Sequence, residues 1–115
     1  MKRIIKKIKL GGKTCFFKPV PSISTDELEK KVTKKPQIID VRETQEFIKG
    51  HIPGAKNIPL GTIADYTPKG KVYVICQSGM RSKKAVNFLK KQGHDVVNVR
   101  GGMMSWSGAR KGGRI

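Results

Sequence analysis

Residues 71–99 decide the fold, and they read KVYVICQSGMRSKKAVNFLKKQGHDVVNV. Two short β-branched runs, 71–75 and 95–99, begin and end this stretch. Their apolar residues are nearly continuous, as expected for parallel strands that are covered on both faces. Between them, residues 82–92 show apolar positions at helical spacing, with lysines on the opposite face. The stretch predicts a strand–loop–helix–strand unit, whose crossover is right-handed in nearly all proteins.

The sequence indicates where the helix of this unit ends and which of its faces is apolar. Gly93 follows it, where the end of a helix favours a left-handed residue. The residues predicted to form its apolar face are Ala85, Val86, Phe88 and Leu89.

Two further elements are predicted before this unit. The run at 37–41 is a third β-branched strand. Ser24 and Glu27 have the spacing of a capping box, which predicts a short helix over 25–34 that Pro36 ends. Alternation of such strands with helices is typical of an α/β domain. We therefore expect a central, mostly parallel sheet with helices on both faces.

The length and composition indicate one globular domain. The chain has 115 residues, of which 37% are hydrophobic and 29% charged. No apolar run approaches the roughly 20 residues that a membrane-spanning helix needs. Prolines near residue 20 discourage helix there. We expect a basic N-terminal arm at 1–21, the domain at 22–106 and a short basic tail at 107–115.

The charge of the chain is its most unusual property. It has 25 Lys and Arg against 8 Asp and Glu, which gives a formal net charge of +17, and residues 1–18 contain no acid. A solvated basic arm is the simplest interpretation. An excess of cations also favours anionic partners, so an alternative function is a binding module that holds RNA, a membrane or a partner protein.

The two cysteines, Cys15 and Cys76, are too few for a disulfide scaffold. Lysines interrupt every apolar stretch near the N-terminus, so no secretory signal is expected. These features predict free thiols and a cytoplasmic protein. Nothing around Cys15 would activate it, and we expect a passive thiol there.

Cys76 has different surroundings, because it directly follows a predicted parallel strand. Ligands of open α/β sheets bind at such carboxyl ends. The loop from Gln77 to Arg81 then leads into a helix, so its backbone N–H groups can form an anion cradle, with Gly79 relieving strain. A helix N-terminus and a neighbouring cation lower the pKa of a thiol from about 8.5 to roughly 3.5–7.5. We expect Cys76 to be a nucleophilic thiolate near neutral pH.

Several short motifs occur in order over residues 23–106. Besides CQSGMRS at 76–82, they are IDVR at 39–42, EF at 46–47, GHIPGA at 50–55, NIP at 57–59, GGM at 101–103 and Trp106. Together they resemble the signatures of the rhodanese family, and the single-domain, thiosulfate sulfurtransferase-like members most of all. The CQSGMRS motif is similar to the active-site loop of that family.

The resemblance implies a sulfurtransferase in which Cys76 is the catalytic residue. Such an enzyme takes a sulfane sulfur from thiosulfate or a persulfide donor, holds it as a cysteine persulfide, and passes it to a thiol, cyanide or protein acceptor. No metal and no organic cofactor is implied. The residues expected to bind substrate are Gln77, Ser78, Gly79, Met80, Arg81 and Arg42. Gln77 and Met80 replace charged or small residues common in the family, which leaves a donor other than thiosulfate open.

Phosphatases and arsenate reductases of the same fold are the competing enzymes. They resemble rhodaneses, but their loop has five residues between cysteine and arginine. Here four residues separate Cys76 from Arg81. A shorter loop makes a narrower cradle, which suits one sulfur atom better than a tetrahedral oxyanion and favours sulfur transfer.

Four other residues have structural interpretations. Asp40 is expected to pair with a nearby cation or to cap backbone amides. For Arg42, substrate binding and an ion pair with a carboxylate such as Glu46 are both open. His51 is expected to be a hydrogen-bonded structural residue rather than a base or a metal ligand. Trp106 is expected to pack in the core.

Overall fold

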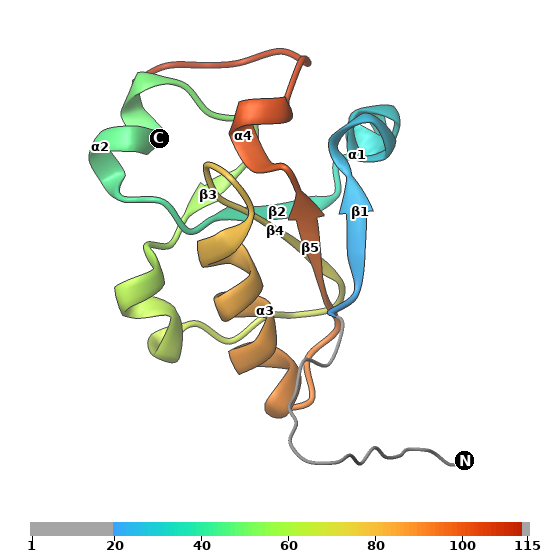
Figure 1. Cartoon of the computed structure of the whole chain (residues 1–115), viewed down its shortest axis with the longest axis vertical. Helices are drawn as coiled ribbons and strands as arrows, with labels where there is room; N and C mark the ends of the chain where they lie inside the picture. Colours follow the sequence, from blue (N-terminus) through green and yellow to red (C-terminus); the bar gives the residue numbers. More distant parts are fainter. Residues whose placement is uncertain (1–19, 114–115) are drawn as a thin grey trace, which may run out of the picture.

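Within residues 20–113, five strands form one parallel sheet in the order β1-β5-β4-β2-β3 (Figure 1). The three predicted runs are confirmed as β2 (Gln37–Asp40), β4 (Val72–Ile75) and β5 (Val96–Arg100). Two shorter strands at the edges, β1 (Ser22–Ser24) and β3 (Lys56–Asn57), have too few residues for a sequence pattern. The predicted α/β class is therefore confirmed, with β4 in the middle of the sheet.

The structure is a computed structural model, and it describes residues 20–113. Cys15 and nearly all of the expected basic arm at 1–21 lie outside the described residues.

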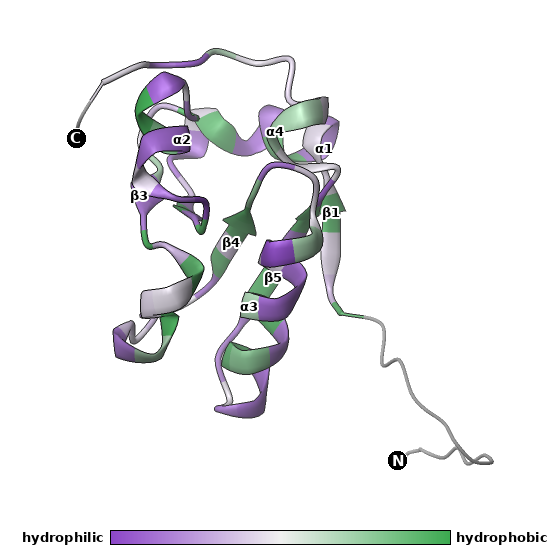
Figure 2. Cartoon of the chain, turned by 60° about the vertical axis from the view of Figure 1, so that its left-hand side comes forward, coloured by the Kyte–Doolittle hydropathy of each residue, from purple (hydrophilic) through white to green (hydrophobic). Residues whose placement is uncertain are grey.

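Helices cover both faces of the sheet. Since consecutive side chains of a strand point in opposite directions, each strand contributes apolar residues to both faces. One face packs against α1 (Thr25–Lys31), α2 (Thr44–Lys49) and α4 (Gly102–Ser105), and the other against α3 (Met80–Lys91) and the 3-10 helix η2 (Leu60–Asp65) (Figure 1). Hydrophobic residues are concentrated along β4 and β5 (Figure 2). The strand residues of the first face include Ile38, Tyr73, Ile75 and Val99, and those of the second include Ile39, Val72, Val74 and Val96.

Helix α1 begins with the predicted capping box. The Ser24 hydroxyl accepts a hydrogen bond from Glu27 N at 3.1 Å, and the Glu27 carboxylate accepts one from Ser24 N at 3.3 Å. A 3-10 turn, η1 (Val32–Lys34), continues the helix, so the predicted span of 25–34 is confirmed.

Helix α3 begins at Met80, two residues before the predicted start, and Gly93 adopts the predicted left-handed conformation. The prediction of its apolar face is wrong for Phe88, which is 36% exposed. An α-helix turns by about 100° per residue, which carries Phe88 round the helix from its buried neighbour Leu89. Ser82 takes a place in the buried face.

The segment after Trp106 packs back on the domain. Lys111 and His51 exchange backbone hydrogen bonds of 2.8 and 2.9 Å, and Gly113 N donates to Ile48 O. The Arg110 guanidinium donates to Met103 O at 2.7 Å. Arg110 therefore packs against α4, and residues 111–113 lie against the end of α2.

Candidate functional site

Cys76 follows the last residue of β4, the middle strand of the sheet. It belongs to the buried cluster on the α3 face and is fully buried. The chain then turns through Gln77, Ser78 and Gly79 and enters α3 (Figure 1). The carboxyl end of the strand and the first turn of the helix therefore meet at one sulfur atom.

The loop directs hydrogen-bond donors at this sulfur. Gly79 N donates to Cys76 Sγ at 3.0 Å, and the thiol contacts Ser82 Oγ at 3.3 Å. Gly79 caps α3 in the left-handed region, with φ of 104°, where a side chain would cause strain. Burial raises the pKa of the Cys76 thiol, but hydrogen bonds from the Ser82 hydroxyl and from the backbone of Ser82, Gly79 and Ser78 outweigh it and hold this pKa below its ordinary value.

Ser82 connects the sulfur to β5. Its hydroxyl lies 3.1 Å from Gly79 O and 2.5 Å from Asn98 Oδ1, and it also accepts from the Cys76 thiol. A hydroxyl carries one proton, so it donates to one of these partners at a time. When Cys76 loses its proton, the Ser82 proton must turn to the sulfur to stabilise the charge. Asn98 Oδ1 and Gly79 O therefore compete with the thiolate for this proton.

Neither Ser82 nor Asn98 is among the sequence-predicted site residues. The signal for Ser82 is its position at the end of the CQSGMRS motif. The signal for Asn98 is a polar residue inside an apolar strand, since Val96 and Val99 are buried on either side of it. A buried polar side chain in a core strand needs a partner, and the partner is close to the reactive group.

We expect Ser82→Ala to raise the pKa of Cys76 and to slow its alkylation about tenfold at a pH below that pKa. A hydrogen bond to a charged group contributes about 1.5–3 kcal/mol, and 1.4 kcal/mol is a factor of ten. The measurement is the rate of iodoacetamide reaction against pH. Ser78→Ala removes an exposed hydroxyl from the same loop and leaves the backbone donors in place. Equal pH profiles for the two variants would contradict the role of the Ser82 hydroxyl.

Helix α4 sets the direction of the loop peptides. Met103 N donates to Cys76 O at 2.8 Å, and Met104 N donates to Gln77 O at 2.9 Å. The C=O and N–H groups of a trans peptide point to opposite sides. Because these two carbonyls face α4, the N–H groups that follow them point away from α4, which brings the Ser78 amide toward the sulfur.

Gly102 allows this close contact. It has a φ of +60°, and a Cβ at this position would overlap Cys76 O and lie 2.7 Å from Gln77 O. The sequence indicated only a tight turn at residues 101–102. The structure shows that the turn lies directly against the Cys76 loop.

Arg81 pairs with Glu46 of α2. Its two terminal nitrogens contact the two carboxylate oxygens at 2.7 and 3.0 Å, and both side chains are 35% exposed. The Arg81 side chain lowers the pKa of Glu46 from 4.5 to about 2. Of the interpretations left open for Arg42, the ion pair with a carboxylate is formed with Asp40 and not with Glu46, whose carboxylate is occupied by Arg81. The Arg81 guanidinium lies at the edge of the loop, while backbone groups and Ser82 contact the sulfur.

This ion pair predicts a specific acid dependence of stability. The folded-state pKa of Glu46 is depressed, so its contribution is fully present above pH 4.5 and is lost as the pH falls toward about 2. Because both side chains are partly exposed, solvent screening keeps the contribution of this ion pair to stability modest. We expect Glu46→Gln to show a smaller fall in the thermal midpoint than the parent between these pH values. Asp65→Asn, which removes an exposed carboxylate, is the control. Parallel curves for parent and Glu46→Gln would contradict the pairing.

Arg42 is buried and held by Asp40, which confirms the structural interpretation of that carboxylate. Asp40 accepts from Arg42 Nε at 3.0 Å, from Nη2 at 2.8 Å and from the Arg42 backbone N at 3.0 Å. Nη2 also donates to Gly50 O, and Nη1 lies 3.4 Å from Gln77 Oε1. Arg42 therefore reaches the loop through the Gln77 side chain.

His51 and Trp106 have the predicted structural roles. His51 is buried, its Nδ1 lies 2.9 Å from Phe47 O, and its ring stacks on Phe47 with centroids 3.7 Å apart. Trp106 is 4% exposed and donates from Nε1 to Ala109 O. Over residues 20–113, no cluster of three His, Cys, Asp or Glu side chains has the arrangement of a metal site. In the same range, no helix has the length and apolarity that crossing a bilayer requires.

Comparison with known proteins finds similar sequences and a similar fold. The sequence model of the rhodanese-like domain matches residues 24–109. YtwF of Bacillus subtilis, provisionally named a sulfurtransferase, is 43% identical over 98 residues, which cover 80% of this chain and 95% of the relative. YrkF of the same species, provisionally named a sulfur carrier protein, is 41% identical over 96 residues, 77% of this chain, and the match spans about half of its length, 52%.

A solved structure agrees with these sequence matches. The crystal structure of a rhodanese-like domain protein from Staphylococcus aureus superposes with a TM-score of 0.75 at 40% identity. The match covers 82% of this chain and 99% of the other.

Proposed function

The chain belongs to the rhodanese-like domain family, and from this we propose that it is a sulfurtransferase that carries a sulfane sulfur as a persulfide on Cys76. The observation that supports this most directly is the set of donors around Cys76 Sγ. Gly79 N lies 3.0 Å from the sulfur, and the Ser82 hydroxyl and further loop amides lower the pKa of the thiol. Fixed donors of this kind stabilise negative charge on one atom without reorganisation.

The proposed reaction has two displacement steps. In the first, the Cys76 thiolate attacks the outer sulfur of thiosulfate, a sulfur–sulfur bond forms on Sγ, and the bond to the sulfite group breaks so that sulfite leaves with its electron pair. In the second, an acceptor thiolate or cyanide attacks the terminal persulfide sulfur and Cys76 leaves as thiolate. Charge and electrons balance in both steps without a metal, a cofactor or an added oxidant. A covalent intermediate of this kind predicts ping-pong kinetics.

The loop dimensions support sulfur transfer over phosphate chemistry. Four residues separate Cys76 from Arg81, and the Arg81 guanidinium is bound to Glu46 at 2.7 Å rather than turned to the sulfur. A phosphatase needs an arginine free to bind the oxygens of the transferred group. A persulfide concentrates its negative charge on one terminal sulfur atom, which loop amides can stabilise without a guanidinium.

Access to the sulfur requires local movement, because Cys76 is fully buried. In the loop beside it, Ser78 and Met80 are exposed. Gln77 is half-buried and is held by Arg42 Nη1 at 3.4 Å, a long contact. We propose that Gln77 and its neighbours move aside when donor or acceptor binds, and that Arg42 acts on substrate through Gln77.

The partners proposed are a thiosulfate or persulfide donor and a thiol, cyanide or protein acceptor. A reducing compartment such as the cytoplasm suits a thiolate that must stay reduced between turnovers. Binding of RNA or a membrane by the basic arm remains a separate prediction, since nearly all of that arm lies outside residues 20–113.

Mass spectrometry of the intact protein and of its Cys76 peptide tests the function. Incubation with thiosulfate, or with a protein persulfide, is expected to add one sulfur atom, about 32 Da, to that peptide. Subsequent addition of cyanide or a thiol is expected to remove it. An unmodified Cys76 peptide after excess of both donors would overturn the proposed function. Modification by the persulfide alone would keep the function and exclude thiosulfate as donor.

A further inference from the structure

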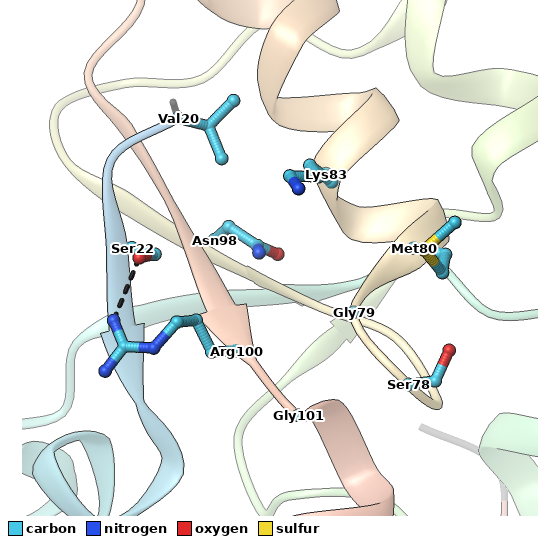
Figure 3. A pocket seen from close by; sticks show the side chains of 9 residues that line it. All are labelled: Val20, Ser22, Ser78, Gly79, Met80, Lys83, Asn98, Arg100 and Gly101. Carbon is cyan, nitrogen blue, oxygen red and sulfur yellow. Dashed lines mark hydrogen bonds between the residues drawn. The ribbon is translucent and has the colours of Figure 1, made fainter. Parts of the chain in front are cut away.

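A pocket lies beside the Cys76 loop, on the side of β5. It has a volume of about 350 Å³ and is lined by the loop, by the first turn of α3, and by β1 and β5. Figure 3 shows Lys83 of α3 and Arg100 of β5 on opposite sides of this pocket, with Asn98 between them. The residues that line it are Val20, Ser22, Ser78, Gly79, Met80, Lys83, Asn98, Arg100 and Gly101.

The two cations of this pocket form no ion pair within residues 20–113, and their nearest effect on a carboxylate is that of Arg100, which, after the hydrogen bonds of Ser24, helps to lower the pKa of Glu27. The two ion pairs within residues 20–113 are Arg42–Asp40 and Arg81–Glu46, so no described carboxylate pairs with Lys83 or Arg100. The Arg100 guanidinium donates one hydrogen bond, to Ser22 Oγ at 2.9 Å, and retains other donors. Lys83 and Arg100 both line the pocket, with the Arg100 guanidinium turned toward Ser22 of β1 (Figure 3), and together they favour an anionic ligand.

Asn98 adds a fixed neutral donor to these cations. It is 4% exposed, and its Oδ1 is used by Ser82. No acceptor among the described residues is hydrogen-bonded to its Nδ2, which therefore faces the pocket as an unsatisfied buried donor (Figure 3). Buried N–H groups are nearly always satisfied, so a group of this kind indicates a bound partner.

We propose that this pocket binds a phosphate monoester, with the phosphate between Lys83, Arg100 and Asn98 Nδ2. A phosphate carries about −1.5 to −2 charge at neutral pH and offers strong acceptor oxygens, which matches two cations and an amide donor. The volume exceeds that of one phosphate group, and Val20 and Met80, which Figure 3 shows on different sides of the pocket, each supply an apolar wall for the organic part.

Occupation of this pocket affects the reactive sulfur, an effect that rests on the proposed function. A phosphate oxygen that accepts a hydrogen bond from Asn98 Nδ2 fixes the orientation of the Asn98 amide. In this orientation Asn98 Oδ1 accepts the hydrogen bond from the Ser82 hydroxyl. The single Ser82 proton then stays with Asn98 instead of turning to Cys76 Sγ, and the added negative charge disfavours a thiolate nearby. The bound phosphate monoester is therefore an inhibitor of thiolate formation.

Binding is tested by titrating the protein with phenyl phosphate and, separately, with inorganic phosphate, while the side-chain amide signals of Asn98 are followed by NMR. Saturable shifts of these signals are expected, with tighter binding of phenyl phosphate because its ring contacts an apolar wall. In Lys83→Ala/Arg100→Ala we expect binding to weaken about tenfold for each cation removed. Lys84→Ala/Lys90→Ala removes the same charge from exposed positions of α3 outside the pocket and should bind as the parent does.

The site would be overturned if the Asn98 signals do not move, or if both double variants lose binding equally, since that would show diffuse attraction to a basic surface. If inorganic phosphate binds as tightly as phenyl phosphate, the site takes free phosphate and the monoester assignment is wrong. The coupling is tested by iodoacetamide alkylation of Cys76, which phenyl phosphate should slow in the parent and not in Lys83→Ala/Arg100→Ala. Unchanged alkylation with saturable binding would overturn the coupling alone. A failure of sulfur transfer would leave the Asn98 shifts intact, so the two failures are distinguishable.

Discussion

Cys76→Ser is expected to reduce sulfur transfer to the background seen without protein. It should also abolish the adduct of one sulfur atom, about 32 Da, on the peptide that contains residue 76. A serine hydroxyl does not ionise near neutral pH in this cradle and forms no persulfide. The fold should survive, because serine has nearly the volume of cysteine and Ser82 Oγ and Gly79 N remain as hydrogen-bond partners. The measurement is steady-state sulfur transfer with thiosulfate and with a protein persulfide, combined with intact mass.

Cys15→Ser is the matched control, since it removes the other cysteine of the chain. It should retain both the adduct and the activity of the parent. Activity that persists in Cys76→Ser and disappears in Cys15→Ser would transfer the chemistry to Cys15 and refute the proposed mechanism.

Gly102→Ala is expected to lower sulfur transfer about 100-fold in a protein that still folds, since displacement of a reacting group by about 1 Å can have this effect. The new Cβ would overlap the Cys76 carbonyl and lie 2.7 Å from Gln77 O. The loop must move, and the hydrogen bonds from Met103 N and Met104 N weaken with it. The amides that face the sulfur then turn, so the pKa of Cys76 should rise.

Gly54→Ala separates this effect from simple backbone strain. Gly54 has a φ of +88°, and a Cβ there meets nothing within 4 Å. Both variants lose roughly 1–2 kcal/mol from the left-handed conformation. Only Gly102→Ala should change the alkylation profile and the activity. If the two variants match in activity and differ only in thermal midpoint, α4 does not control the loop.

The sequence predicted the elements that have strong local signals. The runs that became β2, β4 and β5 are β-branched and buried on both faces, and the capping box of Ser24 and Glu27 formed as its spacing indicated. The strands β1 and β3 and the helices α2 and α4 are short, and their stability comes from tertiary contacts that no local pattern encodes. The prediction that Phe88 is buried was wrong for a related reason, because the hydrophobicity of a residue does not determine which side of α3 meets the sheet.

The predictions for the candidate site also separate into those that depend on local sequence and those that depend on tertiary contacts. The order of strand, cysteine, glycine-containing loop and helix is a local property, so the sequence by itself determined that Cys76 stands at the carboxyl end of a parallel strand. The partners of the charged residues differ in this respect. Arg42 binds Asp40, which is only two residues away, whereas Arg81 binds Glu46 because the fold places α2 beside the loop.

Only the tertiary structure decided which way the loop peptides point. A peptide can turn either its N–H or its C=O toward a neighbouring sulfur, and the loop sequence permits both. Met103 and Met104, 27 residues later in the chain, bind the carbonyls of Cys76 and Gln77, and the second of these contacts turns the Ser78 amide toward the sulfur. The charge state of Cys76 is therefore a property of the assembled sheet and helices, because hydrogen bonds act over the distance between packed groups and not along the chain.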